Sequence, residues 1–84
     1  MELIYTARFL KSLKKLPVLV QNDIIIAVEE FKHRYNHKKL ALHKLHGRMK
    51  TYHAFSANFL YRVVIKIEKN KAYCMDVGTH EVYI

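Results

Sequence analysis

Side chains able to bind and cleave an RNA phosphodiester are concentrated in the C-terminal half of this chain. There a basic, histidine-containing segment, LHKLHGRMKTYHAFSANFLYRVVIKI, precedes the terminal sequence MDVGTHEVYI. RNA cleavage without a metal needs a base for the ribose 2′-hydroxyl proton, cations beside the phosphate and an acid for the leaving oxygen. Lys, Arg, His and Tyr side chains supply all three, so the segment indicates this chemistry as a hypothesis.

Arg62 is the strongest candidate in the segment for binding the phosphate. It alternates with apolar residues in YRVVIKI, a pattern typical of a strand, and a guanidinium on a strand offers phosphate a rigid fork of donors. The alternative is a solvated residue of the sheet surface. The other side chains expected to hold phosphates are Lys44, His46, Arg48, Lys50 and Lys66.

Two histidines and a tyrosine are candidates for proton transfer. His80, in GTHEVY, follows the last expected strand in a loop position where functional side chains are common. His53 is expected in a strand near the same face. Each could instead be a half-buried structural residue. Tyr83 could stack on a base or donate a proton, or it could cover the core.

Other catalytic classes lack their motifs in this chain. His43 and His46 could in principle bind a metal together with His33 and His37, but no paired Cys, HExxH motif or carboxylate completes a set. A Gly-rich phosphate loop and a GxSxG nucleophile elbow are also absent. We therefore expect chemistry that uses no metal and no cofactor.

The composition favours a small, basic, cytoplasmic protein. The 84 residues include 15 Lys and Arg against 7 Asp and Glu, and the net charge of +8 attracts polyanions, foremost nucleic acid, and acidic protein partners. No linker is visible, so residues 1–84 are expected to form one domain. The single Cys fits a reducing cytosol, and we expect no signal peptide and no membrane span.

Two helices are expected in the N-terminal half. Residues 2–5 predict a short edge strand, after which Thr6 can cap a helix with apolar residues at helical spacing. Pro17 suits the first turn of a second helix. The buried stripe of that helix is expected to contain Val20, Ile24, Val28 and Phe31. The short connection predicts an antiparallel helical hairpin, and residues 32–39 predict a basic loop.

Three strands are expected in the C-terminal half. Residues 50–55, 60–68 and 72–77 predict a meander. In its middle strand Val63 and Ile65 belong to the core face, and Arg62 and Lys66 point to the other face. The expected fold class is α+β, in the order β-α-α-β-β-β, with the hairpin packed on one face of the sheet and the opposite face free.

Together, FLKSLKKL and KLHGRMKTYHAFSANFLYRVVIKIEKNKAYCMDVGTHEVY resemble the RelE/ParE superfamily of toxins from type II toxin–antitoxin modules. The resemblance is greatest to its RelE/YafQ-like ribonuclease branch and covers nearly the whole chain. Its most specific parts are LHG at 45–47, YRVV at 61–64 and GTHEVY at 78–83. It implies a helical hairpin on a small, mainly antiparallel, twisted sheet.

The resemblance also implies a function and partners. Members of the ribonuclease branch cut mRNA in the ribosomal A site by attack of the 2′-hydroxyl, without a metal, and an antitoxin that wraps the toxin silences them. By position, Arg62 matches a phosphate-binding arginine, Tyr83 a C-terminal aromatic residue, and His80 a histidine of the YafQ-like subgroup. Lys50 falls near the basic residues of the preceding strand.

This chain departs from that pattern and leaves other functions open. The paired basic residues of the preceding strand and a C-terminal arginine of some relatives are absent, so His53 or His80 is expected to replace them. A gyrase inhibitor of the ParE branch would share the fold and bind a protein. A catalytically inactive relative would bind RNA or its partner alone. A toxin–antitoxin hetero-oligomer is compatible with each of these functions.

Overall fold

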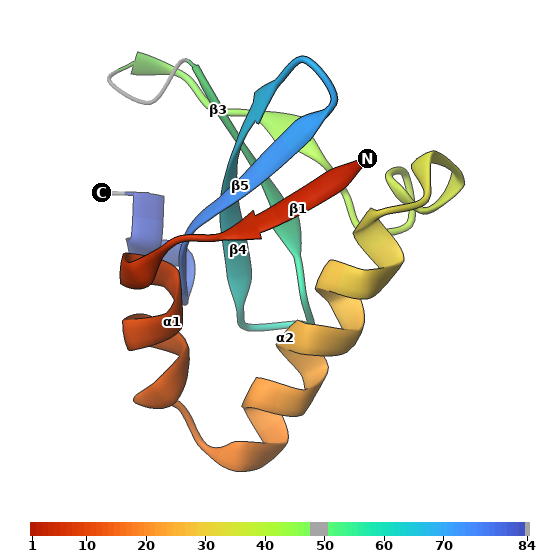
Figure 1. Ribbon diagram of the computed structural model, residues 1–84. Coiled ribbons are helices and arrows are strands. Elements are labelled where there is room, and N and C mark those ends of the chain that lie inside the picture. Colours follow the sequence, from red (N-terminus) through yellow and green to blue (C-terminus); the bar gives the residue numbers. More distant parts are fainter. Residues whose placement is uncertain (48–50, 84) are drawn as a thin grey trace.

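The fold consists of two helices packed on one face of a five-stranded mixed sheet (Figure 1). This computed structural model describes residues 1–47 and 51–83, without the side chains of Tyr35 and Tyr83. The helices are α1 (Ala7–Lys14) and α2 (Val18–Phe31). The strands are β1 (Glu2–Tyr5), β2 (His43–Lys44), β3 (Tyr52–Ser56), β4 (Arg62–Glu68) and β5 (Lys71–Gly78). The 3-10 helices that lie wholly within the described residues are η1 (Arg34–Asn36) and η3 (His80–Tyr83). The expected α+β class is confirmed.

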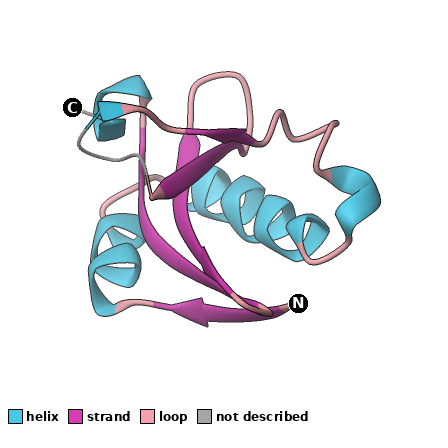
Figure 2. Cartoon of the chain, turned by 90° about the horizontal axis from the view of Figure 1, so that it is seen from above, coloured by secondary structure: helices cyan, strands magenta, loops and turns pink. Residues whose placement is uncertain are grey.

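The strand order is β1-β5-β4-β3-β2. β1, which begins beside the N-terminus, is an edge strand of the sheet (Figure 2). β1 is parallel to β5, and the remaining neighbours are antiparallel. The meander β3-β4-β5 therefore matches the expectation. The prediction missed β2, because a strand of two residues is too short to produce a visible alternation.

Local signals account for the two helices. The Thr6 hydroxyl accepts a hydrogen bond from the backbone N–H of Phe9 (3.2 Å) and donates one to the backbone oxygen of Cys74 (2.7 Å), which caps α1 and attaches it to β5. Pro17 lies immediately before α2, one residue earlier than expected. The helices run in opposite directions and diverge from their short connection (Figure 1).

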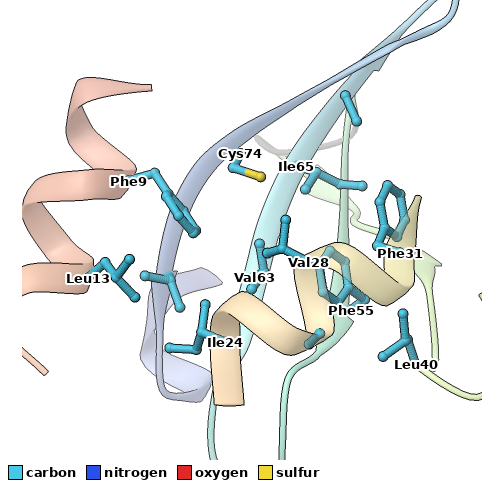
Figure 3. Packing of buried hydrophobic residues seen from close by; sticks show 13 residues of the cluster. Phe9, Leu13, Ile24, Val28, Phe31, Leu40, Phe55, Val63, Ile65 and Cys74 are labelled. Carbon is cyan, nitrogen blue, oxygen red and sulfur yellow. The ribbon is translucent and has the colours of Figure 1, made fainter. Parts of the chain in front are cut away.

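The main core lies between the helices and the sheet (Figure 3). Its side chains come from both helices, from residue 40 and from the inner face of the sheet. They include Phe9, Leu13, Ile24, Val28, Phe31, Leu40, Phe55, Val63, Ile65 and Cys74. Val20, which was expected in the α2 stripe, is only partly buried.

The sheet face opposite the two helices was expected to be free of packed side chains, and this expectation is wrong in part. A second cluster of buried residues, Leu45, Ala54 and Val64, lies on that face and is joined by Tyr52, Met75 and Val82. The cluster forms because the segment after β2 and the C-terminal η3 fold back over the outer side of the sheet. The polar surface of this face is therefore restricted to its ends.

A carboxylate connects α1 to β5. Asp76 accepts hydrogen bonds from the Ser12 hydroxyl (2.6 Å) and from Nε of Arg8 (3.2 Å), beside a register shift in the β4-β5 pairing at Val64 and Ile65.

Within the described residues, neither helix is long and apolar enough to cross a membrane.

Candidate nucleic-acid interface

The strand pairing determines which side chains share the sheet face away from α1 and α2, here called the distal face. Across β3 and β4, Ser56 is opposite Arg62, Ala54 opposite Val64, and Tyr52 opposite Lys66. Since directly opposed residues of antiparallel strands point to the same side, one row of side chains begins at Arg62 and ends at Lys66. Val64 belongs to the outer cluster, which places the whole row on the distal face.

Arg62 is the first residue of β4, whereas a position within the strand was expected. Strand β4 begins late because the Asn58 side-chain oxygen accepts hydrogen bonds from the N–H groups of Leu60 (2.9 Å) and Tyr61 (2.8 Å) and so closes a turn. Opposite Arg62 lie Ser56 on β3 and Gly78 on β5.

The guanidinium of Arg62 is held over its own loop. Its Nη1 donates hydrogen bonds to the backbone oxygens of Asn58 (3.2 Å), Phe59 (3.3 Å) and Tyr61 (3.2 Å). Nε and Nη2 make no hydrogen bond to another described residue. One edge of the group is thus fixed by the fold, and the other edge carries donors in the fork geometry that suits a phosphate.

His80 lies at the same end of the sheet as Arg62. It is the first residue of η3, two positions beyond the Gly78 that pairs with Arg62, and its side chain is exposed. η3 packs beside this end of β5: a Cβ at residue 78 would lie 3.4 Å from Cβ of Val82, an ordinary van der Waals contact. Arg62 and His80 are therefore brought together on neighbouring elements, and the side chain of Tyr83 is outside the described part of the structure.

His53 and Lys44 lie on the helix side, not on the distal face. His53 is opposite Ile65 and alternates with Ala54, and Lys44 is opposite His53. The expectation that His53 shares a face with His80 is wrong, because the side chains of β3 alternate and Ala54 occupies the outer face. Burial, assisted by the nearby charges of Lys44 and His43, lowers the pKa of His53, and its buried Nδ1 has no hydrogen-bond partner in the part of the chain that the structure describes. This favours the neutral imidazole.

The remaining basic candidates are dispersed. Lys66 is on the distal face at the far end of β4 from Arg62, where its Nζ lies 3.9 Å from a carboxylate oxygen of Glu68. His46 is exposed and follows the short strand β2. Arg48 and Lys50 are outside the described residues.

A metal site does not assemble from the histidines that could in principle have formed one. His37 bonds through Nε2 to the backbone oxygen of Phe31 (2.8 Å) and stacks on the Phe31 ring, and His43 bonds through Nδ1 to the oxygen of Ala41 (2.9 Å). Among residues 1–47 and 51–83, no group of three His, Cys, Asp or Glu side chains could hold a metal ion.

Exposed apolar side chains gather on α2 and on the adjoining β3-β4 loop, a feature that the sequence reading did not identify. Leu19 is 78% exposed and Phe59 is 93% exposed. The loop adjoins α2 because Asn58 donates a hydrogen bond to the Asp23 carboxylate (3.1 Å). The α2 patch is defined here as Val18, Leu19, Ile26, Phe59 and Leu60. Helix α2 contains three carboxylates and no Lys or Arg, in contrast to the basic chain around it.

The fold is similar to that of several solved structures, some of which are toxins of toxin–antitoxin complexes. The structure is similar to a conserved hypothetical protein from Helicobacter pylori, with a TM-score of 0.77 and 16% identity over 96% of each chain. It is also similar to a chain of the RelB-RelE antitoxin–toxin complex from Methanococcus jannaschii, with a TM-score of 0.75 and 21% identity over 94% of this chain and 92% of that one.

A third similar structure is YafQ from Escherichia coli, with a TM-score of 0.72 and 13% identity over 96% of this chain and 94% of that one. The sequence matches no protein-family model and no curated protein. At these identities the shared property is the fold, and it is the fold that the sequence resemblance implied.

Proposed function

We propose that this chain is the toxin of a type II toxin–antitoxin module and a metal-independent, ribosome-dependent mRNA endoribonuclease. The observation that carries the proposal is the juxtaposition of Arg62 and His80 at one end of the distal face. Support comes from the net charge of +8 and from a fold shared with solved toxins.

In the proposed reaction Arg62 holds the scissile phosphate with the edge of its guanidinium that the loop does not use. The pentavalent phosphate gains negative charge during attack by the 2′-hydroxyl, and a preorganised guanidinium stabilises that charge. His80 acts as the general acid or base, a role suited to an imidazole near neutral pH. Tyr83 is proposed to assist from the same 3-10 helix. His53 is left out because it faces the opposite side of the sheet.

One observation favours the second candidate, a relative that binds RNA or protein without cutting. All three hydrogen bonds from Arg62 go to backbone oxygens of residues 58–61, so the side chain has a structural role whether or not it also binds phosphate. The ParE-like alternative is inhibition of DNA gyrase. After induced expression it would damage DNA, whereas the nuclease would cut mRNA.

The test is primer-extension mapping of transcripts after induced expression of the wild type and of Arg62→Ala at equal abundance. The nuclease predicts new 5′ ends within translated regions for the wild type and their loss in the variant. DNA damage with intact mRNA would identify the gyrase inhibitor. Intact mRNA and DNA, also in ribosome assays at high protein concentration, would identify the inactive relative.

The proposed partner is a cognate antitoxin that contacts two different surfaces. Its acidic residues would neutralise the basic surface, and an apolar segment would cover the α2 patch, which exposes large side chains to water. Asp23 has a neutral amide as its hydrogen-bond partner, so a Lys or Arg on that segment would complement it. The solved relatives include complexes of RelB with RelE and of YefM with YoeB.

A further inference from the structure

A row of two tyrosines and a lysine crosses the distal face away from Arg62. Tyr52 on β3 is opposite Lys66 on β4, and Lys66 is opposite Tyr73 on β5. Tyr73 alternates with Ala72 and Cys74, which belong to the main core, so it points outward. These three side chains are called the tyrosine row.

The geometry of the row suits unpaired bases. Its two tyrosines are separated by two strand spacings, ~10 Å, so each ring can stack on a separate base. The orientation of the Tyr52 side chain is restricted because it packs on the outer cluster of Leu45, Ala54 and Val64. Lys66, whose side chain is 39% exposed, stands between the rings and can approach a phosphate. Aromatic residues on an exposed sheet face are a common means of binding single-stranded RNA.

A pocket of about 470 Å³ adjoins the row at Tyr73. The other residues lining it are Glu2, Glu68, Lys69, Asn70 and Lys71. Two carboxylates balance two ammonium groups, so the lining has no net charge and is better suited to a base than to a phosphate. The carboxylates and the Asn70 amide can bind the amino and carbonyl groups on a base edge.

We infer that the tyrosine row and its pocket form a second RNA-binding site, which stacks unpaired bases of the strand whose phosphate lies at Arg62. Arg62 and Lys66 are four residues apart along β4, or ~13 Å, a span that a short single-stranded oligonucleotide covers. The inference rests on the proposed function in taking RNA as the ligand. It separates two tasks on one face, with phosphate chemistry at one end and base stacking at the other.

The test compares a fluorescein-labelled hexaribonucleotide with an abasic analogue of equal charge, using fluorescence anisotropy. The wild type is expected to bind the base-bearing oligonucleotide about a hundredfold more tightly, at about tenfold for each of two stacked bases. Tyr73→Leu should lower that preference to about tenfold, the part that Tyr52 supplies, and Tyr73→Phe should retain the full preference because the ring remains. Equal binding of both oligonucleotides by the wild type, or an unchanged preference in folded Tyr73→Leu, would overturn the inference.

A measurement on the unmodified chain covers the case in which Tyr73→Leu does not fold. In an NMR titration with the hexaribonucleotide, ring protons of Tyr52 and Tyr73 should shift upfield, while those of Tyr5, which stacks on Phe9 on the helix side, should not. Unshifted Tyr52 and Tyr73 rings would refute the site.

Neither measurement depends on cleavage. A chain that prefers bases but leaves mRNA intact would retain the inference and refute the nuclease. A chain that cuts mRNA without a base preference would refute the inference alone.

Discussion

Replacing Arg62 tests whether its guanidinium acts on RNA or only stabilises its loop. The two N–H groups of Nη1 are shared among three backbone oxygens at 3.2 to 3.3 Å. Hydrogen bonds from a charged group contribute about 1.5–3 kcal/mol net, and these lengths place the sum near the lower limit. Arg62→Ala should therefore lower the free energy of unfolding by about 1.5–2 kcal/mol, which for a chain of this size lowers Tm by roughly 6–16 °C.

Asn58→Ala is the matched control, because it loosens the same loop without removing the guanidinium. Its side chain accepts two backbone hydrogen bonds and donates one to Asp23. The loss of these three bonds, two between neutral groups and one exposed bond to the Asp23 carboxylate, should destabilise the fold by about 1–2 kcal/mol, similar to the effect of Arg62→Ala. Thermal unfolding followed by circular dichroism measures both values.

The two variants should differ in activity. Removing a donor that stabilises the transition state lowers the cleavage rate by about 10²–10³-fold, so Arg62→Ala should lose that much in a reconstituted translation assay read by primer extension. Asn58→Ala should stay within a few-fold of the wild type at a temperature well below its Tm. Equal losses in the two variants, or full activity of Arg62→Ala, would refute the role of Arg62 as the phosphate ligand.

Three further predictions concern the partner surface, the core and pH. Leu19→Lys should weaken binding of the cognate antitoxin at least tenfold in calorimetry while leaving Tm unchanged, because this side chain is 78% exposed; unchanged affinity would remove the α2 patch from the interface. Burial raises the pKa of Cys74 to about 12, so about 1 in 10⁵ of these thiols is ionised at neutral pH, and a thiol reagent should label it only after denaturant is added; rapid labelling of the folded chain would contradict this. Burial, with the charges of Lys44 and His43, lowers the pKa of His53 below its ordinary 6.5, so the unfolded chain binds the proton more readily and stability falls as pH drops below that value. His53→Gln should reduce the fall in Tm between about pH 7 and pH 5; a pH profile of Tm identical to that of the wild type would show that His53 is not responsible.

Local patterns were sufficient for most elements of the fold. Thr6 predicted the start of α1 because a side-chain cap depends on neighbours in sequence. The alternation around Val63 predicted the core face of β4 because adjacent strand residues point to opposite sides. The two-residue β2 was missed because so short a strand is formed by its pairing with β3 and not by its own pattern.

The composition of the candidate site was less predictable. Arg62 and His80 could be singled out by residue type and position, but His53 was assigned to the wrong face because its strand was predicted without a register to β4. Tyr52 and Tyr73 were missed altogether. The alternation of Tyr73 with Ala72 and Cys74 was the available signal, but one strand does not reveal which residues of the next strand lie beside it.

By itself, the sequence determined the order of the main elements, the basic charge of the chain and the residues with the means to act on RNA. These properties depend on composition and on contacts between near neighbours. Only the tertiary structure decided that Arg62 and His80 lie at one end of the distal face and that His53 lies on the opposite, helix side of the sheet. It also decided that two tyrosines flank Lys66. Each of these facts follows from strand register, which is determined by packing between residues far apart in the chain.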